Sequence, residues 1–409
     1  MTTAEEGLLA RASGGLPPVP PTAASPNRPI GSIAFLGVAI TSLGGPLALA
    51  ALYAPTIVAD ASASAGLVAV AGALVFGFPL LVWLRYAQQI NTSGGLYSFV
   101  EAAAGRRVAS VQAGLWIASY LLYLTYTTAS IVYDTLPAVL PGVRGYQPLL
   151  EVAIPVLLAA VMLAGRAVTL VVIGALAAGQ LLLVGALAGV SIAHDAPVSA
   201  FAAHPPPGAV STATGQVALL YICGSLPLFL GGEVAHPVRT VRRGLVGAYA
   251  LVATGVVAAV FPLAQNPAFT RAPIPGMSVA EVFAGHRLAV AVGVGVAASV
   301  AGVMLVEYLA LSRLLHFVTA RSTRSIIAVL AAVLVASAPL SLLNPDRFYS
   351  DLLKPSLIAL WLSQLIVFAV YPRLPGRRPG PRWPAVTLAI LASAVTLYGL
   401  YAGLHYSTT

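Results

Sequence analysis

The sequence is poor in charged residues and holds one lysine and one cysteine. Of its 409 residues only 8% are charged, whereas soluble domains carry about 25%. So few charges cannot cover a solvated surface, which excludes a soluble enzyme, a nucleic-acid-binding module and a disordered protein. The single cysteine, Cys223, excludes an intrachain disulfide and a cysteine metal cluster. The six histidines have no metal-ligand spacing, so the sequence indicates no metal site and no cofactor.

What the sequence has instead is apolar length. Hydrophobic residues make up 59% of the chain, and a helix crosses a bilayer with about 20 of them. The apolar stretches are too long and too uniform for the alternating strands of a membrane β-barrel. They predict an all-α polytopic membrane protein with about eleven transmembrane helices. The predicted spans are 29–59, 61–84, 108–133, 152–165, 167–193, 205–232, 244–270, 288–306, 325–345, 355–372 and 383–404.

The basic residues predict the orientation of these spans. Of the 21 lysines and arginines, all but five fall on the same side of the predicted membrane as the N-terminus. The five on the other side are Arg144, Arg271, Arg287, Arg347 and Lys354. Since cytoplasmic loops carry the basic excess, we expect a plasma-membrane protein with a cytoplasmic N-terminus and an external C-terminus.

The first and sixth spans carry helix-breaking residues in their middle. They read AITSLGGPLALA and YICGSLPLFLGG, with the breaks at residues 41–46 and 223–227. Glycine and proline weaken a helix there, and backbone groups freed inside lipid are costly unless they line a cavity or bind a ligand. Two interrupted helices in corresponding halves are typical of a transporter binding site. The alternative for each is a plain kink packed against its neighbours.

Three stretches carry a family resemblance. SGGLYSFVEAAAGRR at 93–107, EVAHPVRTVRRGL at 233–245 and LALSRLLHFVTAR at 309–321 resemble segments of the amino acid–polyamine–organocation (APC) superfamily of permeases. Together with the broken spans, the resemblance covers about residues 31–372. It implies a LeuT-like fold, in which two five-helix repeats are inverted relative to each other and the first and sixth helices are discontinuous.

From the composition of the N-terminal residues and from this resemblance we expect five segments. Residues 1–29 form a disordered cytoplasmic tail, 30–193 the first repeat, 194–213 an outer loop, 214–372 the second repeat, and 373–409 a cytoplasmic loop with one further helix. The segment 94–104 is expected to form an interfacial helix. Family members usually have twelve transmembrane helices, so the last would be missing here.

The resemblance also implies where a substrate binds. The family's site falls on the unwound segments and on tyrosines of the third span, which here wall or gate the pocket or simply pack within the bundle. The candidate residues are Thr41, Ser42, Leu43, Gly44, Gly45, Ile222, Cys223, Gly224, Ser225, Tyr120 and Tyr123. Gln180 occupies the place of a lysine found in some members, and Ser299 is the lone hydroxyl of the eighth span, so the common lysine–proton and sodium devices are not matched.

Two acidic residues have a predicted role, one within a span and one at the inner end of span six. Glu307 lies within the eighth span, where a charge is costly and needs a partner or a cavity. It is either a protonatable coupling carboxylate, a cytoplasmic-gate ion pair with Arg85, or a residue at the lipid interface. Glu233 is expected to order the loop after span six by pairing with Arg239 or Arg242.

The sequence therefore favours a secondary transporter of an amino acid or related amine, working by alternating access with proton symport or exchange. Its partners would be that small-molecule substrate, protons and the lipid bilayer, with no nucleic acid. The oligomeric state and the substrate stay open. The alternatives are a channel or facilitator, and a membrane enzyme that acts on a lipid-linked substrate.

Overall fold

The computed structural model describes residues 29–194, 198–343, 345–374 and 382–406. Helices account for nearly all of this part, and no strand occurs in it apart from one isolated parallel bridge between Ile30 and Val234. Residues 1–28 of the predicted tail and residues 375–381 of the predicted cytoplasmic loop lie outside the described residues. The prediction of an all-α chain is confirmed for the part that is described.

The helices follow one another with short connections. In the first half they are α2 (Ser32–Ser42), α3 (Pro46–Ala48), η1 (Leu49–Tyr53), α4 (Ala54–Ile57), η2 (Ala59–Ser64), α5 (Ala65–Ala87), α6 (Leu96–Ala104), α7 (Arg106–Ser130), η3 (Ile131–Thr135), α8 (Leu136–Val139), η4 (Pro141–Tyr146), α9 (Gln147–Leu163) and α10 (Arg166–His194). In the second half they are η5 (Val198–Phe201), α11 (Pro207–Leu219), η6 (Ile222–Glu233), α12 (Pro237–Ala259), α13 (Pro262–Gln265), η7 (Pro267–Arg271), α14 (Pro275–Ala284), α15 (His286–Thr319), α16 (Thr323–Leu343), α17 (Pro345–Val370), η8 (Tyr371–Arg373) and α18 (Trp383–Tyr406).

Ten helical segments of the described chain are long and apolar enough to cross a membrane, one fewer than the eleven predicted. The difference falls on the predicted span 325–345. It corresponds to α16, which is helical over Thr323–Leu343. Within the described residues its apolar part covers Thr323–Ala338, and it is not among the ten. The predicted span 152–165, in contrast, is longer than expected, because the helical segment runs over Pro141–Leu163.

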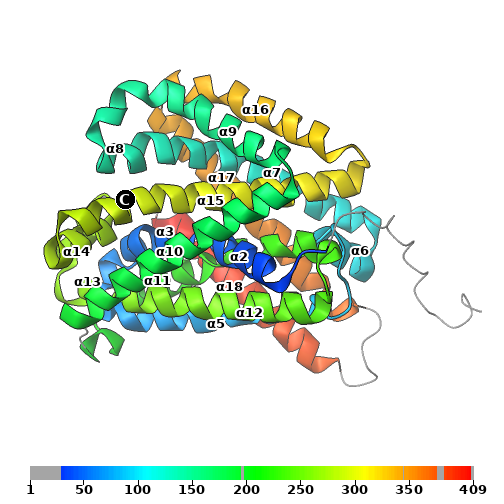
Figure 1. Cartoon of the computed structure of the whole chain (residues 1–409). Helices are drawn as coiled ribbons and strands as arrows, with labels where there is room; N and C mark the ends of the chain where they lie inside the picture. The colour runs from blue at the N-terminus through cyan, green and yellow to red at the C-terminus, as the bar shows by residue number, and fades with distance from the viewer. Residues whose placement is uncertain (1–28, 195–197, 344, 375–381, 407–409) are drawn as a thin grey trace, which may run out of the picture.

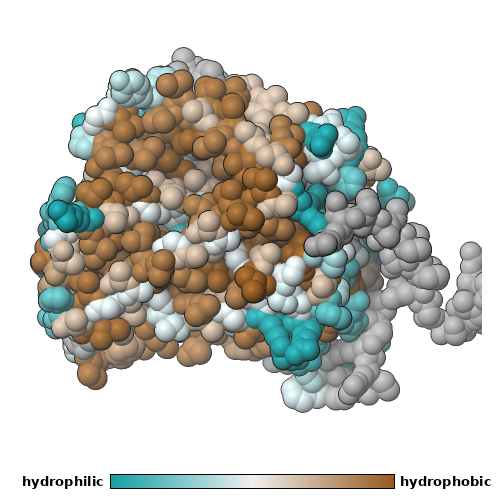
Figure 2. Space-filling view, in the orientation of Figure 1, coloured by the Kyte–Doolittle hydropathy of each residue, from teal (hydrophilic) through white to brown (hydrophobic). Residues whose placement is uncertain are grey.

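The surface agrees with a lipid environment. The long helices lie roughly along one direction, with α6 at one end of the bundle and α13 and α14 at the other (Figure 1). Apolar residues cover most of the face in view, and hydrophilic residues gather toward its two ends (Figure 2). Large apolar side chains such as Leu74, Val171 and Leu182 are more than 70% exposed. A soluble monomer rarely shows so much contiguous apolar surface, so these helices indicate a membrane-embedded protein.

Two long helices surround the interrupted ones. The helix α15 packs against α2, α3 and η6, and α10 packs against α2, α3 and α15. The helix α7 lies along α17 and also contacts α15. The last helix, α18, covers the outside of α5, α11 and α17. The interrupted segments are therefore enclosed by helices, and only their ends approach the surface.

Candidate functional site

The first span is broken where the sequence predicts it. The helix α2 ends at Ser42, α3 begins at Pro46, and Gly44 and Gly45 between them have φ values of 72° and 70°. Side-chain-bearing residues rarely adopt this left-handed conformation, whereas glycine does so readily. The two glycines thus allow the chain to turn inside the bundle, and the π-helical turn η1 follows at once.

The sixth span is also discontinuous, but its break differs in place and form. The helix α11 ends at Leu219, a turn follows at residues 220–221, and η6 continues as a 12-residue 3₁₀ helix to Glu233. The predicted break around Gly224 and Pro227 lies within this 3₁₀ helix. Its tighter bonds run from each N–H to the third residue back, as from Gly224 to the Tyr221 carbonyl at 2.9 Å. Glycine and proline therefore change the type of helix here rather than end it.

The two breaks face each other in the interior. A Cβ placed on Gly224 would lie 2.7 Å from Leu43 Cδ2, and one on Gly44 would lie 3.2 Å from the carbonyl oxygen of Leu220. Both are closer than ordinary van der Waals contact. The small residues predicted for the site therefore let the two interrupted segments approach each other, and leave no free space at Gly44 or Gly224 themselves.

A polar network holds the first break against two long helices. Ser299 Oγ of α15 donates to Gln180 Oε1 of α10 at 2.7 Å and accepts from the N–H of Ala48 in α3 at 3.1 Å. Thr41 and Gly302 lie beside the Gln180 amide. Thr41 Oγ1 and Gln180 Nε2 are buried, and neither has a hydrogen-bond partner among the described residues. The break therefore presents a donor and a hydroxyl that a ligand or water can satisfy.

The tyrosine Tyr120 connects α7 to the second break. Its hydroxyl donates to Cys223 Sγ at 3.7 Å, and its ring lies against Trp116 with centroids 4.2 Å apart. Tyr123 lies one turn further along α7 and packs its ring against Tyr126, at 5.9 Å between centroids. The structure thus places Tyr120 at the break, while Tyr123 is partly exposed beside it.

The hydroxyl groups of two predicted serines are already hydrogen-bonded. Ser42 Oγ donates to the Ala39 carbonyl of its own helix at 2.8 Å. Ser225 Oγ accepts from Gln364 Nε2 of α17 at 3.3 Å, and Gln364 Oε1 accepts from Trp83 of α5, also at 3.3 Å. Sequence reasoning missed this chain of polar contacts. The signal available for it was Gln364 itself, a lone amide in the apolar stretch WLSQLIVFAV.

Glu307 is fully buried, with an exposed fraction of 0%. Neither carboxylate oxygen has a hydrogen-bond partner in the part of the chain that the structure describes. The expected ion pair with Arg85 is not formed, because Arg85 is exposed at the end of α5 while Glu307 lies inside the bundle. The position at the lipid interface is wrong as well, since the side chain is enclosed.

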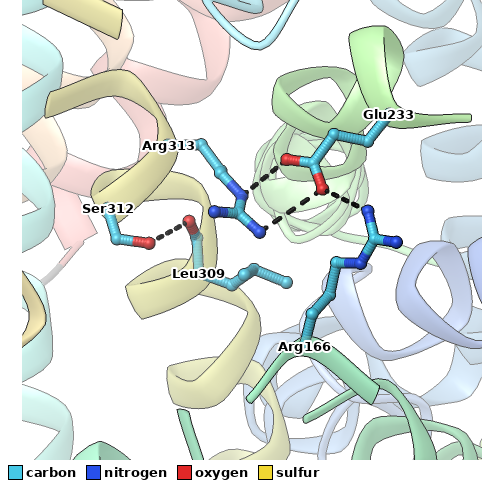
Figure 3. A network of polar contacts seen from close by, with 5 residues as sticks. All are labelled: Arg166, Glu233, Leu309, Ser312 and Arg313. Atoms are coloured by element: carbon cyan, nitrogen blue, oxygen red, sulfur yellow. Dashed lines mark hydrogen bonds and ion pairs between the residues drawn. The ribbon is translucent and has the colours of Figure 1, made fainter. Parts of the chain in front are cut away.

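Glu233 binds two arginines that the sequence analysis did not select. It pairs with Arg166 at 3.1 Å and with Arg313 at 2.7 Å, so one carboxylate joins the end of η6 to α10 and α15 (Figure 3). Its backbone carbonyl accepts from the N–H of Ile30 at 2.8 Å, just before α2 begins. The predicted local pairing with Arg239 or Arg242 is therefore wrong. We call Arg166, Glu233 and Arg313 the arginine clamp.

Comparisons with known proteins add no identification. No protein-family model matches the chain, and no curated protein matches its sequence.

Proposed function

We propose that this protein is a secondary transporter, a permease of the plasma membrane that carries an amino acid or related amine by alternating access. The observation that carries the proposal is the meeting of two interrupted spans in the interior, next to unpartnered polar groups. Interrupted helices offer backbone donors and acceptors to a ligand at membrane depth. The resemblance to APC permeases, with their LeuT-like inverted repeats, is part of the proposal and agrees with breaks in the first and sixth spans.

The arginine clamp supports a particular conformation of this carrier. It joins three helices beside the start of α2, at the end of the bundle that the basic residues assign to the cytoplasm. A carrier that alternates access must close one end while the other opens. We propose that the clamp closes the cytoplasmic end in this conformation, and that proton symport or exchange drives the cycle.

Counterflow in proteoliposomes tests the proposal. Vesicles are loaded with an unlabelled mixture of the common amino acids, tyramine and isoamylamine, and then diluted into one radiolabelled compound at a time. A carrier gives a transient, saturable accumulation of at least one label, which protein-free vesicles do not show. A flux that rises without saturation indicates a channel instead. Absence of protein-dependent flux for every compound refutes the proposed substrate class.

A further inference from the structure

The side of α15 that carries Glu307 faces the first break. Ser299, Val303 and Glu307 follow one another at intervals of four residues, so they lie on one side of the helix. A Cβ placed on Gly45 would meet the Ser299 side chain and would lie 3.1 Å from Val303 Cγ2. Glu307 continues this side of α15 one turn beyond Val303.

Residues of α7 and η6 also lie near Glu307. Glu307 lies close enough to Tyr120, Tyr123 and Cys223 to interact electrostatically with all three. Behind Tyr120, the ring of Trp116 packs between Tyr120 and Phe229, with its centroid 4.6 Å from that of Phe229. The carboxyl group thus lies near a thiol and two phenol groups, with further aromatic rings behind Tyr120, and such surroundings suit an organic cation.

The charged groups on the helices packed against α15 are engaged or placed elsewhere. Arg166 and Arg313 share Glu233, and Glu281 pairs with His286 on the surface. Glu151 of α9 is buried and accepts from the Tyr133 hydroxyl of η3 at 3.2 Å. The exposed charges on these helices are Arg106 and Arg107 of α7, Asp134 of η3, Arg287 of α15 and Arg324 of α16. The remaining phenols are Tyr126 of α7, which packs against Tyr123, Tyr308 of α15, which donates to the Ile327 carbonyl, and Tyr53 of η1, which interacts with Tyr123. Within the described residues, no cation of the protein neutralises Glu307.

An ionised carboxylate cannot stay alone at this place. Removing a charge from water without a partner is strongly unfavourable, and the group takes up a proton or binds a cation instead. One carboxylate balances one positive charge. A second charge on a ligand, such as the carboxylate of a zwitterion, has no partner of opposite sign here.

We propose that Glu307 is a single-cation site, whose carboxyl group holds either a proton or the ammonium group of a monocationic amine. Binding then exchanges the two: the protonated carboxyl gives up its proton, the ammonium group pairs with the carboxylate, and one proton leaves for each amine that enters. What this site means for transport rests on the proposed function. A carrier with this site performs electroneutral one-for-one exchange of an amine for a proton, with an alkyl or arylalkyl monoamine as substrate.

Calorimetry on the purified full chain in detergent tests the site without requiring transport. Tyramine is compared with tyrosine, and isoamylamine with leucine, because each pair differs by one carboxylate. Titration at neutral pH in phosphate and in Tris buffers, whose ionisation enthalpies differ, gives the number of protons released. We expect both amines to bind more tightly than their amino acids, with about one proton released per amine.

Variants separate Glu307 from a general effect on folding. Glu307→Gln keeps the shape and removes the charge, so we expect amine affinity to fall on the order of a hundredfold and proton release to disappear. Glu307→Asp retains a titratable carboxyl and should still release a proton, at lower affinity. Glu281→Gln removes an exposed carboxylate and should leave binding unchanged.

Several results overturn the inference. They are tighter binding of tyrosine and leucine than of their amines, no binding of either amine by folded wild-type protein, and undiminished proton release in folded Glu307→Gln. If Glu307→Gln does not fold, loss of proton release in folded Glu307→Asp also overturns the inference. Amine binding with proton release but without counterflow refutes the carrier and keeps the site. Counterflow without proton release refutes the single-cation site and keeps the carrier.

Discussion

The arginine clamp gives a quantitative prediction for closure of the bundle. Glu233→Gln removes the one negative charge shared by Arg166 and Arg313, whose side chains are 20% and 14% exposed. Breaking a fully buried pair costs about 3–5 kcal/mol, and an exposed pair contributes about 0–1 kcal/mol. For groups that are mostly but not fully buried we take ~2 kcal/mol. This corresponds to a roughly 30-fold shift from the closed toward the open state.

Cys223 would report this opening, because it is the only cysteine of the chain and is 8% exposed in this structure. It lies at the second break, which an opening between α2, η6 and α15 would uncover. We expect N-ethylmaleimide to alkylate Cys223 up to roughly 30-fold faster in Glu233→Gln than in wild type, as followed by intact mass. In oriented vesicles an impermeant thiol reagent should show the increase from the cytoplasmic side only.

Two controls make the result specific to the clamp. Arg313→Gln leaves Glu233 with Arg166, so its effect should be smaller than that of Glu233→Gln. Glu281→Gln breaks a surface pair whose members are 48% and 76% exposed, and it should not change the labelling rate. An unchanged rate of Cys223 alkylation in folded Glu233→Gln would refute the clamp as a closing device.

Two further predictions concern the first break. Gly45→Ala and Gly105→Ala both place a side chain at positive φ, at a cost of about 1–2 kcal/mol. A Cβ on Gly45 would in addition lie 2.9 Å from the carbonyl oxygen of Ser299, whereas nothing lies within 4 Å of a Cβ on Gly105. We therefore expect a lower unfolding temperature for Gly45→Ala than for Gly105→Ala in detergent, and equal values would contradict the close packing of the break. The second prediction is that Ser299→Ala, which leaves the Ala48 N–H and the side-chain amide oxygen of Gln180 unpaired, destabilises the protein by about 1–3 kcal/mol. Ser337→Ala, which removes a hydroxyl bonded to the Leu334 carbonyl of its own helix, should have a smaller effect on unfolding, and an equal effect would exclude the polar network as a support of the break.

The parts of the fold that the sequence predicts well are those set by local chemistry. Apolar stretches of about 20 residues form helices in a membrane because a helix pairs its backbone groups internally. Gly44-Gly45-Pro46 interrupts a helix because of its own backbone preferences. The sixth span was predicted less well. The residues Gly224 and Pro227 indicate a weak α-helix, but they do not determine whether the chain unwinds or tightens into a 3₁₀ helix. That outcome depends on contacts with Leu43, Tyr120 and Gln364, which come from distant spans.

Partners of charged side chains were predicted poorly for the same reason. Glu233 has Arg239 and Arg242 close by in sequence, yet it pairs with Arg166 and Arg313, 67 and 80 residues away. The helix α12 begins at Pro237, and His236 before it has a left-handed φ of 50°. The chain therefore turns away directly after η6. Arg239 and Arg242 lie on α12 after this turn, while the Glu233 carboxylate lies between α10 and α15.

The clamp and the buried carboxylate are linked through the placement of the arginines. Arg313 lies six residues after Glu307 on α15, about 9 Å along the helix axis and on a different side of it. Because Glu233 holds Arg313 and Arg166 at the end of the bundle, neither guanidinium neutralises Glu307 while the clamp is closed. The positive charge at Glu307 must then come from a proton or a ligand. An opening that breaks the clamp frees two cations near the interior, which would weaken the hold of Glu307 on its own cation. The arginines that we propose to close the cytoplasmic end would thus also favour release of the cation once that end opens.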